Sequence, residues 1–408
     1  MGAIQSHVVI AGGGMVGLTL AIALARGGFE VAVADPMTAE QMADERFDGR
    51  VSALAFASVR MLRVLGLWQR LEREAQPIND ILVNESTVGR GPSPFSLHFD
   101  HREIGEPLGH IVENRHIRQA LLAEIAAESR IRFFPGTSAT TLAVKEGLAR
   151  IALSDGREIV APLAIAAEGR ESALREAQGI GIIGWDYGQT GIVTTVVHER
   201  PHQAVAYEQF LPTGPFAILP MTGNRASLVW TEEAAQARNL LALSEGPFTA
   251  ELKRRFGTHL GEVKPIGPRW SYPLRLHLAR SYVKDRFALI GDAAHTIHPL
   301  AGQGLNLGLK DVAALTETLL DAARLGRDYG QLDVLERYER WRRFDSFVLA
   351  VATDSLNRLF SNDFPPLKLA RELGMGAVDR IAPLRRFFMR HAGGDFGVLP
   401  RLLKGEAA

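Results

Sequence analysis

Cysteine is absent from this 408-residue chain, and its absence excludes several kinds of chemistry. Without thiols there is no cysteine nucleophile, no disulfide framework and no cysteine-ligated metal centre. The absence of disulfides is compatible with a reducing cytoplasm, where we expect the protein to be located. Basic and acidic side chains number 46 each, so the formal net charge is zero, and we expect no nucleic-acid partner.

Several familiar motifs are absent as well. No G-x-S-x-G elbow indicates a serine hydrolase, and the spacing of Gly304 and Lys310 is wrong for a phosphate-binding P-loop. Asp292, His295 and His298 are spaced three apart, but at a turn between a strand and a helix we expect no metal ion. An uncharged run at 8–25 has the length of a membrane span, yet adjacent glycines interrupt it and no Lys or Arg precedes it. A nucleotide-binding turn explains this run better.

The N-terminal run has the order strand, glycine turn, helix, strand. Residues 7–11 (HVVIA) predict a buried strand, a helix is expected to about Arg26, and a second strand ends at Asp35. The turn fits G-x-G-x-x-G, the pattern that brings a pyrophosphate to a helix N-terminus, and the acid suits the adenosine ribose. The candidate cofactor-binding residues here are Gly12, Gly14, Val16, Gly17 and Asp35.

The stretch at 288–311 organises the rest of the chain. An apolar run at 288–290 is broken by a turn containing Asp292, and a long helical pattern follows Gly302 and Gly304. A helix N-terminus presents free backbone N–H groups to an electron-rich ligand. Glycines there let the backbone approach a flat ring closely, and the Asp292 carboxylate can accept a ribityl or ribose hydroxyl.

The sequence HPLAGQGLNLGLKD at 298–311 resembles the signature of the flavin hydroxylases of ubiquinone biosynthesis. These belong to the single-component FAD aromatic hydroxylases, similar to para-hydroxybenzoate hydroxylase, and the resemblance extends over about residues 6–343. The stretch at 49–54 is expected to open an amphipathic helix that reaches to about Leu65. The resemblance implies that Arg50 contacts the flavin from there; the alternative is a solvated arginine at the helix start. One departure is Glu168, where the group usually has Asp. The remaining cofactor contacts that the resemblance implies are Asn114, Pro299, Leu305 and Asn306.

Residues 182–278 change pattern and predict a mostly antiparallel sheet, inserted between two halves of the nucleotide domain. The expected fold class is α/β: a Rossmann-like FAD-binding domain (1–180 and 279–345), a β-sheet substrate domain (181–278) and a helical C-terminal region (346–408). The resemblance implies that the sheet roofs the substrate pocket. Phe216, Pro220 and Trp230 are candidates to line it; the alternative is that they form sheet core.

Aromatic residues beside arginines at 384–390 (LRRFFMR) suit a helix at a membrane surface, or equally a helix that packs on the body of the protein. The first interpretation would give a peripheral contact with the inner membrane surface. Partners would then include other proteins of quinone biosynthesis besides the hydrophobic substrate.

The resemblance implies an FAD-dependent monooxygenase that hydroxylates the ring of a polyprenylated phenol or quinone precursor. NAD(P)H would reduce FAD, O2 would give a flavin C4a-hydroperoxide, and the electron-rich ring would take up one oxygen atom. No side chain stands out as an obligatory acid or base. Two alternatives are a flavin oxidoreductase without oxygen insertion and a non-catalytic binder of prenylated ligands.

Overall fold

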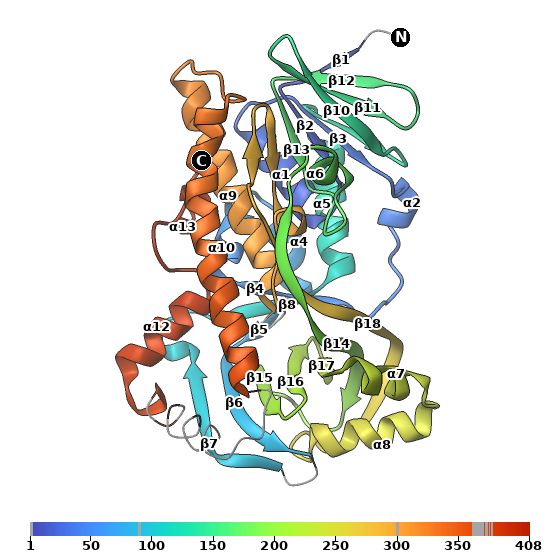
Figure 1. The fold of residues 1–408 in the computed structure, drawn as a ribbon. Coiled ribbons are helices and arrows are strands. Elements are labelled where there is room, and N and C mark those ends of the chain that lie inside the picture. The colour runs from blue at the N-terminus through green and yellow to red at the C-terminus, as the bar shows by residue number, and fades with distance from the viewer. Residues whose placement is uncertain are drawn as a thin grey trace.

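A computed structural model describes residues 3–88, 91–298, 302–360, 371, 374, 376 and 378–408, without the side chains of 87, 91–95 and 303. Figure 1 shows two parts stacked vertically, with the chain starting in the upper part and the long helix α10 running down one side of both. The predicted fold class is confirmed: a nucleotide-binding α/β part carries a large, mostly antiparallel sheet and helices near the C-terminus.

A six-stranded sheet forms the centre of the upper part. Its strands run parallel except for the antiparallel pair at one edge, β19 and β20. Parallel strands are covered on both faces, and this explains why the sequences of β2 (VVIA) and β13 (LAIA) are continuously apolar. The strands, in sheet order, are β19 (Val283–Lys284), β20 (Phe287–Leu289), β13 (Leu163–Ala166), β2 (Val8–Ala11), β3 (Val31–Asp35) and β9 (Ile131–Pro135).

Helices pack on this sheet and share its hydrophobic core. Leu20 of α1, Leu315 of α9 and Tyr338 of α10 are fully buried in the core that contains β2 and β13. The short helix α13 returns from the C-terminus to the same core through Leu402 and Leu403. The helices of this part are α1 (Met15–Arg26), α2 (Ala39–Met42), α3 (Phe56–Val64), α4 (Trp68–Leu71), α5 (Asn114–Ala127), α6 (Ala173–Ala177), α9 (Gln303–Arg324), α10 (Leu332–Phe360) and α13 (Arg401–Lys404). Helix α12 (Ala382–Ala392) instead lies beside the lower part (Figure 1).

Two small sheets complete the upper part. One of them contains a hairpin, in which β11 and β12 pair antiparallel on either side of Asp155 and Gly156. The four-stranded sheet is β1 (Ile4–Gln5), β12 (Glu158–Ala161), β11 (Leu148–Leu153) and β10 (Ala139–Lys145), and the three-stranded sheet is β4 (Val51–Ala55), β8 (Gly109–Glu113) and β5 (Gln76–Ile78).

An eight-stranded sheet forms the lower part, and α7 (Ala234–Ala242) and α8 (Glu245–Phe256) cover one of its faces (Figure 1). All of its neighbouring strands are antiparallel except the parallel pair β15 and β6. The strands, in sheet order, are β21 (His295–Thr296), β18 (Val263–Ala279), β14 (Ile182–His198), β17 (Arg225–Glu233), β16 (Gly214–Met221), β15 (Val205–Leu211), β6 (Asp80–Thr87) and β7 (Gly91–Asp100).

The structure differs from the sequence-based boundaries in three places. Residues 80–100, expected within the nucleotide domain, form β6 and β7; β6 pairs with the edge of β15, and β7 pairs with β6. Helix α10 runs without a break through the expected boundary at 345–346. The helix expected to open at 49–54 begins only at Phe56, since Val51–Ala55 pair with β8 as a strand. In the described part of the chain, no helix is long and apolar enough to cross a membrane.

Candidate functional site

The first glycine loop joins β2 to α1. Gly12 has a φ of +108°, and a Cβ on it would overlap the backbone of Ala167. A Cβ on Gly17 would overlap the Gly12 carbonyl oxygen, so Gly17 lets α1 approach the loop closely. The Cβ position of Gly14, in contrast, faces open space with no protein atom within 4 Å. The loop therefore has room for a ligand at Gly14 and is closed by protein at the other two glycines, an arrangement that fits a pyrophosphate.

Asp35 ends β3 beside this loop. Its Oδ2 accepts a hydrogen bond from the backbone N–H of Gly13 at 2.6 Å, and its Oδ1 accepts one from the N–H of Met37 at 2.8 Å. The buried carboxylate thus fixes the shape of the loop. A carboxylate has about four lone-pair positions, so two remain for ribose hydroxyls, and this predicted role stays a prediction.

Val16 links the first glycine loop to the second. A Cβ on Gly308 of α9 would lie 2.7 Å from Val16 Cγ2, and one on Gly291 would lie 3.4 Å from Val16 Cγ1. These two glycines let α1 pack directly against α9 and against the turn after β20. Val16 therefore sets the spacing between the two loops.

The second loop brings Asp292 to the wall of a cavity. Asp292 lies in the 3-10 turn η3 (Gly291–Ala293), between β20 and β21. Solvent reaches its carboxyl group from the cavity, while protein surrounds it on most sides, and this desolvation raises its pKa. A hydroxyl-bearing ligand could therefore reach the carboxyl group.

Helix α9 begins at the same cavity. Gly302 has a φ of +64°, and a Cβ on it would lie 2.9 Å from Ala53 Cβ on β4, so only glycine fits here without strain. The Cβ position of Gly304 is open, and Leu305 lines the cavity beside it. The first turn of α9 thus presents bare backbone and free N–H groups. Pro299 lies outside the described residues.

Asn306 holds this first turn in place. Its Nδ2 donates to the Ala53 carbonyl at 2.8 Å, and its Oδ1 accepts from the Ala55 N–H and the Ser58 hydroxyl, both at 2.9 Å. The side chain is buried, and its amide bonds to protein groups on β4 and α3. In this structure Asn306 positions the helix end rather than facing the cavity.

Arg50 and Asn114 lie together on the opposite wall of the cavity. The backbone N–H of Asn114 donates to the Arg50 carbonyl at 2.9 Å, and Asn114 Oδ1 accepts from the Ser52 hydroxyl at 2.7 Å. The Arg50 guanidinium pairs with Asp48 at 2.7 Å and lies over the ring of Trp270, 4.9 Å from its centroid. Arg50 immediately precedes the strand β4, so the prediction that it lies at a helix start was wrong.

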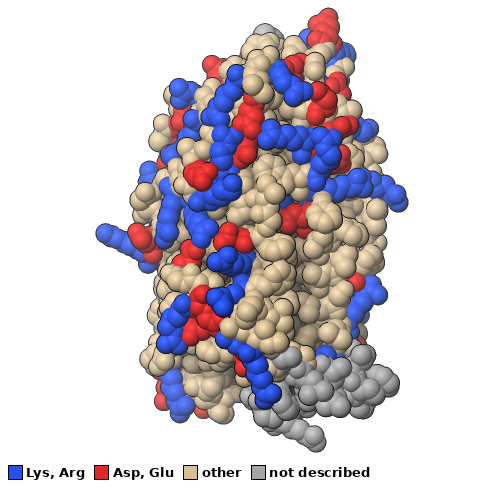
Figure 2. All heavy atoms as spheres, turned by 90° about the vertical axis from the view of Figure 1, so that its left-hand side faces the viewer, with Lys and Arg blue, Asp and Glu red and all other residues tan. Residues whose placement is uncertain are grey.

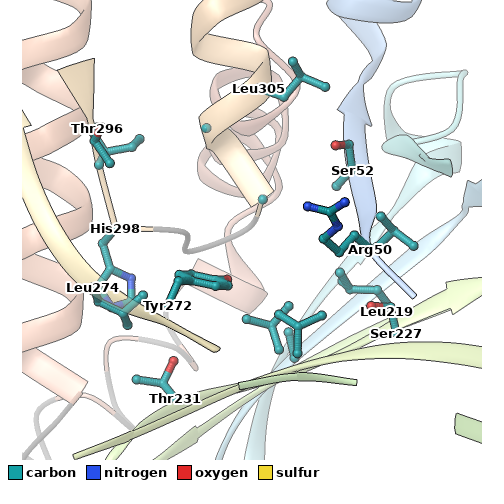
Figure 3. A pocket seen from close by; sticks show the side chains of 18 of the residues that line it. Arg50, Ser52, Leu219, Ser227, Thr231, Tyr272, Leu274, Thr296, His298 and Leu305 are labelled. Atoms are coloured by element: carbon teal, nitrogen blue, oxygen red, sulfur yellow. The ribbon is translucent and has the colours of Figure 1, made fainter. Parts of the chain in front are cut away.

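The cavity has a volume of about 300 Å³ and lies between the start of α9, the loop before β4 and the eight-stranded sheet. In Figure 3 the labelled side chains converge on it: Leu305 from α9 above, Arg50 and Ser52 from one side, and Thr231, Leu219 and Ser227 from the sheet below. Most of the sheet side of the wall is apolar or carries hydroxyl groups, as expected for a site that binds a flat hydrophobic molecule.

The predicted substrate-pocket residues Phe216, Pro220 and Trp230 do not line this cavity. Phe216 and Trp230 face the other side of the sheet and are fully buried against α7 and α8. Side chains alternate along a strand, so a shift of one residue selects the wrong face. The residues that do line the cavity from β16 and β17 are Pro215, Ala217, Leu219, Ser227, Val229 and Thr231.

Several polar residues in the cavity wall were not singled out from the sequence as ligand contacts, among them a phenol, an imidazole and an acid. Tyr272 comes from β18, and desolvation raises its pKa to about 12. His298 is fully buried, neither ring nitrogen has a partner among the described residues, and desolvation lowers its pKa to about 4. Glu208, on β15, is the acid. The sequence AYEQF could have indicated it, because Glu208 lies between Ala206 and Phe210 on the same face of a strand, where an apolar residue is expected.

A buried ion network lies behind the cavity and joins α9, α10 and β21. Asp311 accepts hydrogen bonds from His295 Nε2 at 2.6 Å, from Arg342 Nε at 2.8 Å and from the Gly291 N–H at 2.9 Å. Burial opposes the ionisation of Asp311, but His295 and Arg342 outweigh it and lower its pKa. The network therefore holds the turn that carries Asp292 against two helices. Within the described residues, no cluster of acidic and histidine side chains suits a metal ion.

Comparisons with known proteins agree with this geometry. A family model described as an FAD binding domain matches residues 5–346. The p-nitrophenol 4-monooxygenase PnpA of Pseudomonas putida has the same fold: its structure aligns with a TM-score of 0.79 over 97% of this chain and 100% of that chain, at 18% identity.

Two curated relatives are much more similar in sequence. The ubiquinone hydroxylase UbiL of Rhodospirillum rubrum is 50% identical over 403 residues, which are 98% of this chain and 93% of that protein. The 3-demethoxyubiquinol 3-hydroxylase of Escherichia coli (strain K12) is 37% identical over 394 residues, 95% of this chain and 98% of that protein. The chain therefore belongs to the FAD-binding domain family and, within it, to the FAD-dependent hydroxylases of ubiquinone biosynthesis.

Proposed function

We propose that this protein hydroxylates the aromatic ring of a polyprenylated phenol or quinone precursor of ubiquinone, with FAD as cofactor and with NAD(P)H and O2 as co-substrates. The observation that carries the proposal is the cavity, which has bare backbone at the start of α9 on one side and an apolar sheet face on the other. The first side suits a flat cofactor ring and the second a planar hydrophobic substrate. The names of the two curated relatives support this substrate class.

Within this proposal the glycine loops hold FAD. When bound, FAD supplies the acceptance of hydride and the activation of oxygen. The first turn of α9 would stabilise negative charge on the flavin ring, by up to about 2 kcal/mol for a partly buried helix end. The apolar sheet face would exclude water from the reacting atoms. The proposed FAD-binding residues are Gly12, Gly14, Val16, Gly17 and Asp35 for the adenosine and pyrophosphate half, and Arg50, Asn114, Asp292, Pro299, Gly302, Gly304 and Leu305 for the flavin half. Asn306 would act on the flavin half indirectly, by holding the first turn of α9.

We also propose a division of labour between the two parts of the fold. Residues 1–180 and 279–345 would bind FAD, and the sheet at 181–278 would select the substrate. The pairing of β6 with β15, and of β7 with β6, supports adding residues 80–100 to the substrate part. The C-terminal region after 345 would contribute a surface rather than a separate domain, because α10 spans the boundary.

The proposed surface is a peripheral contact with an anionic lipid bilayer, from which a prenylated substrate could be drawn. Phe344, Phe347 and Val351 form an exposed stripe along α10, and the side chain of Phe344 is 74% exposed. Phe387 of α12 and Phe396 add a second apolar cluster, with ring centroids 5.2 Å apart. Figure 2 views this side of the molecule and shows an uncharged strip bordered by Lys and Arg, with Asp and Glu interspersed among them. Exposed aromatic residues flanked by basic ones are typical of a helix at a membrane surface.

Vesicle sedimentation tests the bilayer contact. The Phe344→Ser/Phe347→Ser variant should bind vesicles containing anionic lipid several-fold more weakly than the wild type does. Val144→Ser is the matched control, because Val144 is an exposed apolar residue on the distant β10. Equal binding by all three proteins would contradict the assignment of this face.

Oxygen labelling tests the reaction itself. The purified protein with FAD, NAD(P)H, 18O2 and a short-chain prenylated phenol should yield a product that carries one labelled oxygen on the ring. Cells that lack the gene should accumulate a precursor without that oxygen. Reduction without label would instead indicate an oxidoreductase, and a protein that never retains FAD would indicate a ligand binder.

A further inference from the structure

Glu208 occupies an unusual position in the part of the cavity wall that the eight-stranded sheet forms, which we call the roof. The described strands β14 to β17 contribute Val193, Pro215, Ala217, Leu219, Ser227, Val229 and Thr231 to the wall, all of them apolar or hydroxyl-bearing. Glu208 of β15 is the only ionisable side chain that these strands add to the wall. It stands in one row across the sheet with Ala217 and Val229.

The immediate neighbours of Glu208 on this face of the sheet are apolar. Ala217 on β16 and Val83 on β6 lie directly across from it. Ala206 and Phe210, two residues away in either direction along β15, point to the same side. Phe210 in turn stacks on Phe360 at the end of α10, with ring centroids 4.0 Å apart. The carboxyl group is therefore set into an apolar surface that opens on the cavity.

Within the part of the chain that the structure describes, no protein group compensates for this placement. Among the described residues, Glu208 has neither a hydrogen bond nor an ion pair, and desolvation alone raises its pKa to about 7. The other titratable side chains of the cavity wall do not contribute to that shift: they are Arg50, Arg170, Tyr272, Arg275, Asp292 and His298. An unpaired carboxyl group in apolar surroundings destabilises a fold, so its presence points to a ligand.

We propose that Glu208 is a catalytic residue that accepts the hydroxyl proton of the phenolic substrate. The O–H bond of the phenol breaks, the proton moves to a carboxylate oxygen of Glu208, and the electron pair stays on the phenol oxygen. That oxygen then donates electron density to the ring carbon that is hydroxylated. After product release Glu208 returns the proton to solvent. This inference rests on the proposed hydroxylase function and assigns the proton acceptor that the sequence alone did not identify.

The test compares the FAD-loaded wild type with Glu208→Gln, which keeps the shape of the side chain but cannot take a proton. Product formation should fall by about 10²- to 10⁴-fold, the usual contribution of a general base. The acid limb of the kcat/KM profile, with an apparent pKa near 7, should disappear, while the FAD content stays at the wild-type level. A ring-fluorinated phenol ionises more readily and should recover much of the lost rate. Glu233→Gln, on an exposed acid at the end of β17, is the matched control and should behave as wild type.

Two results would overturn the assignment. One is a Glu208→Gln variant with the rate and pH profile of the wild type. The other is a higher KM with unchanged kcat and an unchanged profile, since that combination indicates binding alone.

A binding measurement separates this inference from the proposed function. The apparent pKa of a bound chromophoric phenol, read from its phenolate absorbance, should differ between the wild type and Glu208→Gln without any turnover. If the wild type makes no hydroxylated product but the two pKa values differ, the proposed function fails and the proton contact stands. Equal pKa values would remove the contact itself.

Discussion

Substituting alanine for Gly14 should affect FAD binding, whereas substituting alanine for Gly17 should affect stability, although both residues lie in the same glycine loop. The Cβ position of Gly14 is open, and its backbone angles (φ −69°, ψ 178°) are accessible to any residue. A Cβ on Gly17 would overlap the carbonyl oxygen of Gly12, which is backbone and cannot rotate away. Gly14→Ala should therefore weaken FAD binding in a stable protein, whereas Gly17→Ala should destabilise the protein before any ligand is added.

The expected magnitudes separate the two variants clearly. Overpacking at Gly17 should cost about 3 kcal/mol, the upper end of the usual range, because the overlapping atom belongs to the backbone. The better helix propensity of alanine offsets up to about 1 kcal/mol of that, which leaves about 2 kcal/mol. Gly14 is an N-cap without a side-chain bond, so alanine there should change the free energy of unfolding of the apoprotein by only about 0.5 kcal/mol. The new methyl group would occupy the space left for the pyrophosphate. A loss of 1.4 kcal/mol of binding free energy is a factor of ten, and we expect the FAD Kd to rise at least about tenfold.

Urea unfolding of the flavin-free proteins and FAD titration measure the two quantities independently. Gly14→Ala should unfold at the wild-type urea concentration and bind FAD weakly; Gly17→Ala should unfold at a lower concentration. Should Gly14→Ala lose stability as Gly17→Ala does while it keeps wild-type FAD affinity, the assignment of the open space to the cofactor would be wrong.

Three further predictions concern the acids around the cavity. Asp292→Ala should lower the FAD content of the purified protein because a hydroxyl acceptor is lost, and an unchanged flavin-to-protein absorbance ratio would contradict this role. Asp311→Ala should lower the free energy of unfolding at pH 7 by about 1.5–3 kcal/mol, because the buried Arg342 loses one of its two carboxylate partners and keeps only Asp345. The folded-state pKa of Asp311 is depressed, so the stability that this carboxylate contributes is fully present above its unfolded pKa of about 4 and is lost as the pH falls further. Equal urea midpoints of wild type and Asp311→Ala at pH 7 would refute the network's role. Glu208→Gln should stabilise the apoprotein above about pH 7, because burial raises the folded-state pKa of Glu208 and makes its carboxylate unfavourable there. This gain in stability should vanish near about pH 4, where the carboxyl group is protonated in both states. A gain that does not depend on pH would mean that burial does not disfavour the carboxylate.

The nucleotide-binding elements could be predicted because their sequences have one simple physical meaning. Strands buried on both faces must be apolar throughout, and glycines at Gly12 and Gly17 are required by backbone that approaches too closely for a Cβ. The predicted strand, loop and helix therefore lie within one or two residues of β2, α1 and β3.

The substrate side could not be predicted as well, because both faces of the large sheet are covered. One face packs on α7 and α8 and the other forms the cavity roof, so apolar residues alternate with apolar residues along β16 and periodicity cannot assign Phe216 to a face. The pairing of β6 with β15 joins residues more than a hundred positions apart, and local sequence carries no signal for it. Asn306 was found through the family resemblance, but only the structure shows that its amide bonds to β4 and α3.

These two kinds of position imply different freedoms to change. On the FAD side, glycines such as Gly12, Gly17 and Gly302 lie too close to neighbouring atoms for a Cβ to fit, so few substitutions are compatible with this side. The roof consists of side chains on strands that would keep their pairing if Ala217, Val229 or Thr231 changed size. A wider or narrower roof over an unchanged flavin site would present a different ring carbon to the same oxidant. Glu208 then becomes the fixed point of the roof, because a proton acceptor has to meet the hydroxyl group whichever carbon is hydroxylated. Roof variants should therefore alter the position of hydroxylation while the acid limb of the pH profile stays where Glu208 sets it.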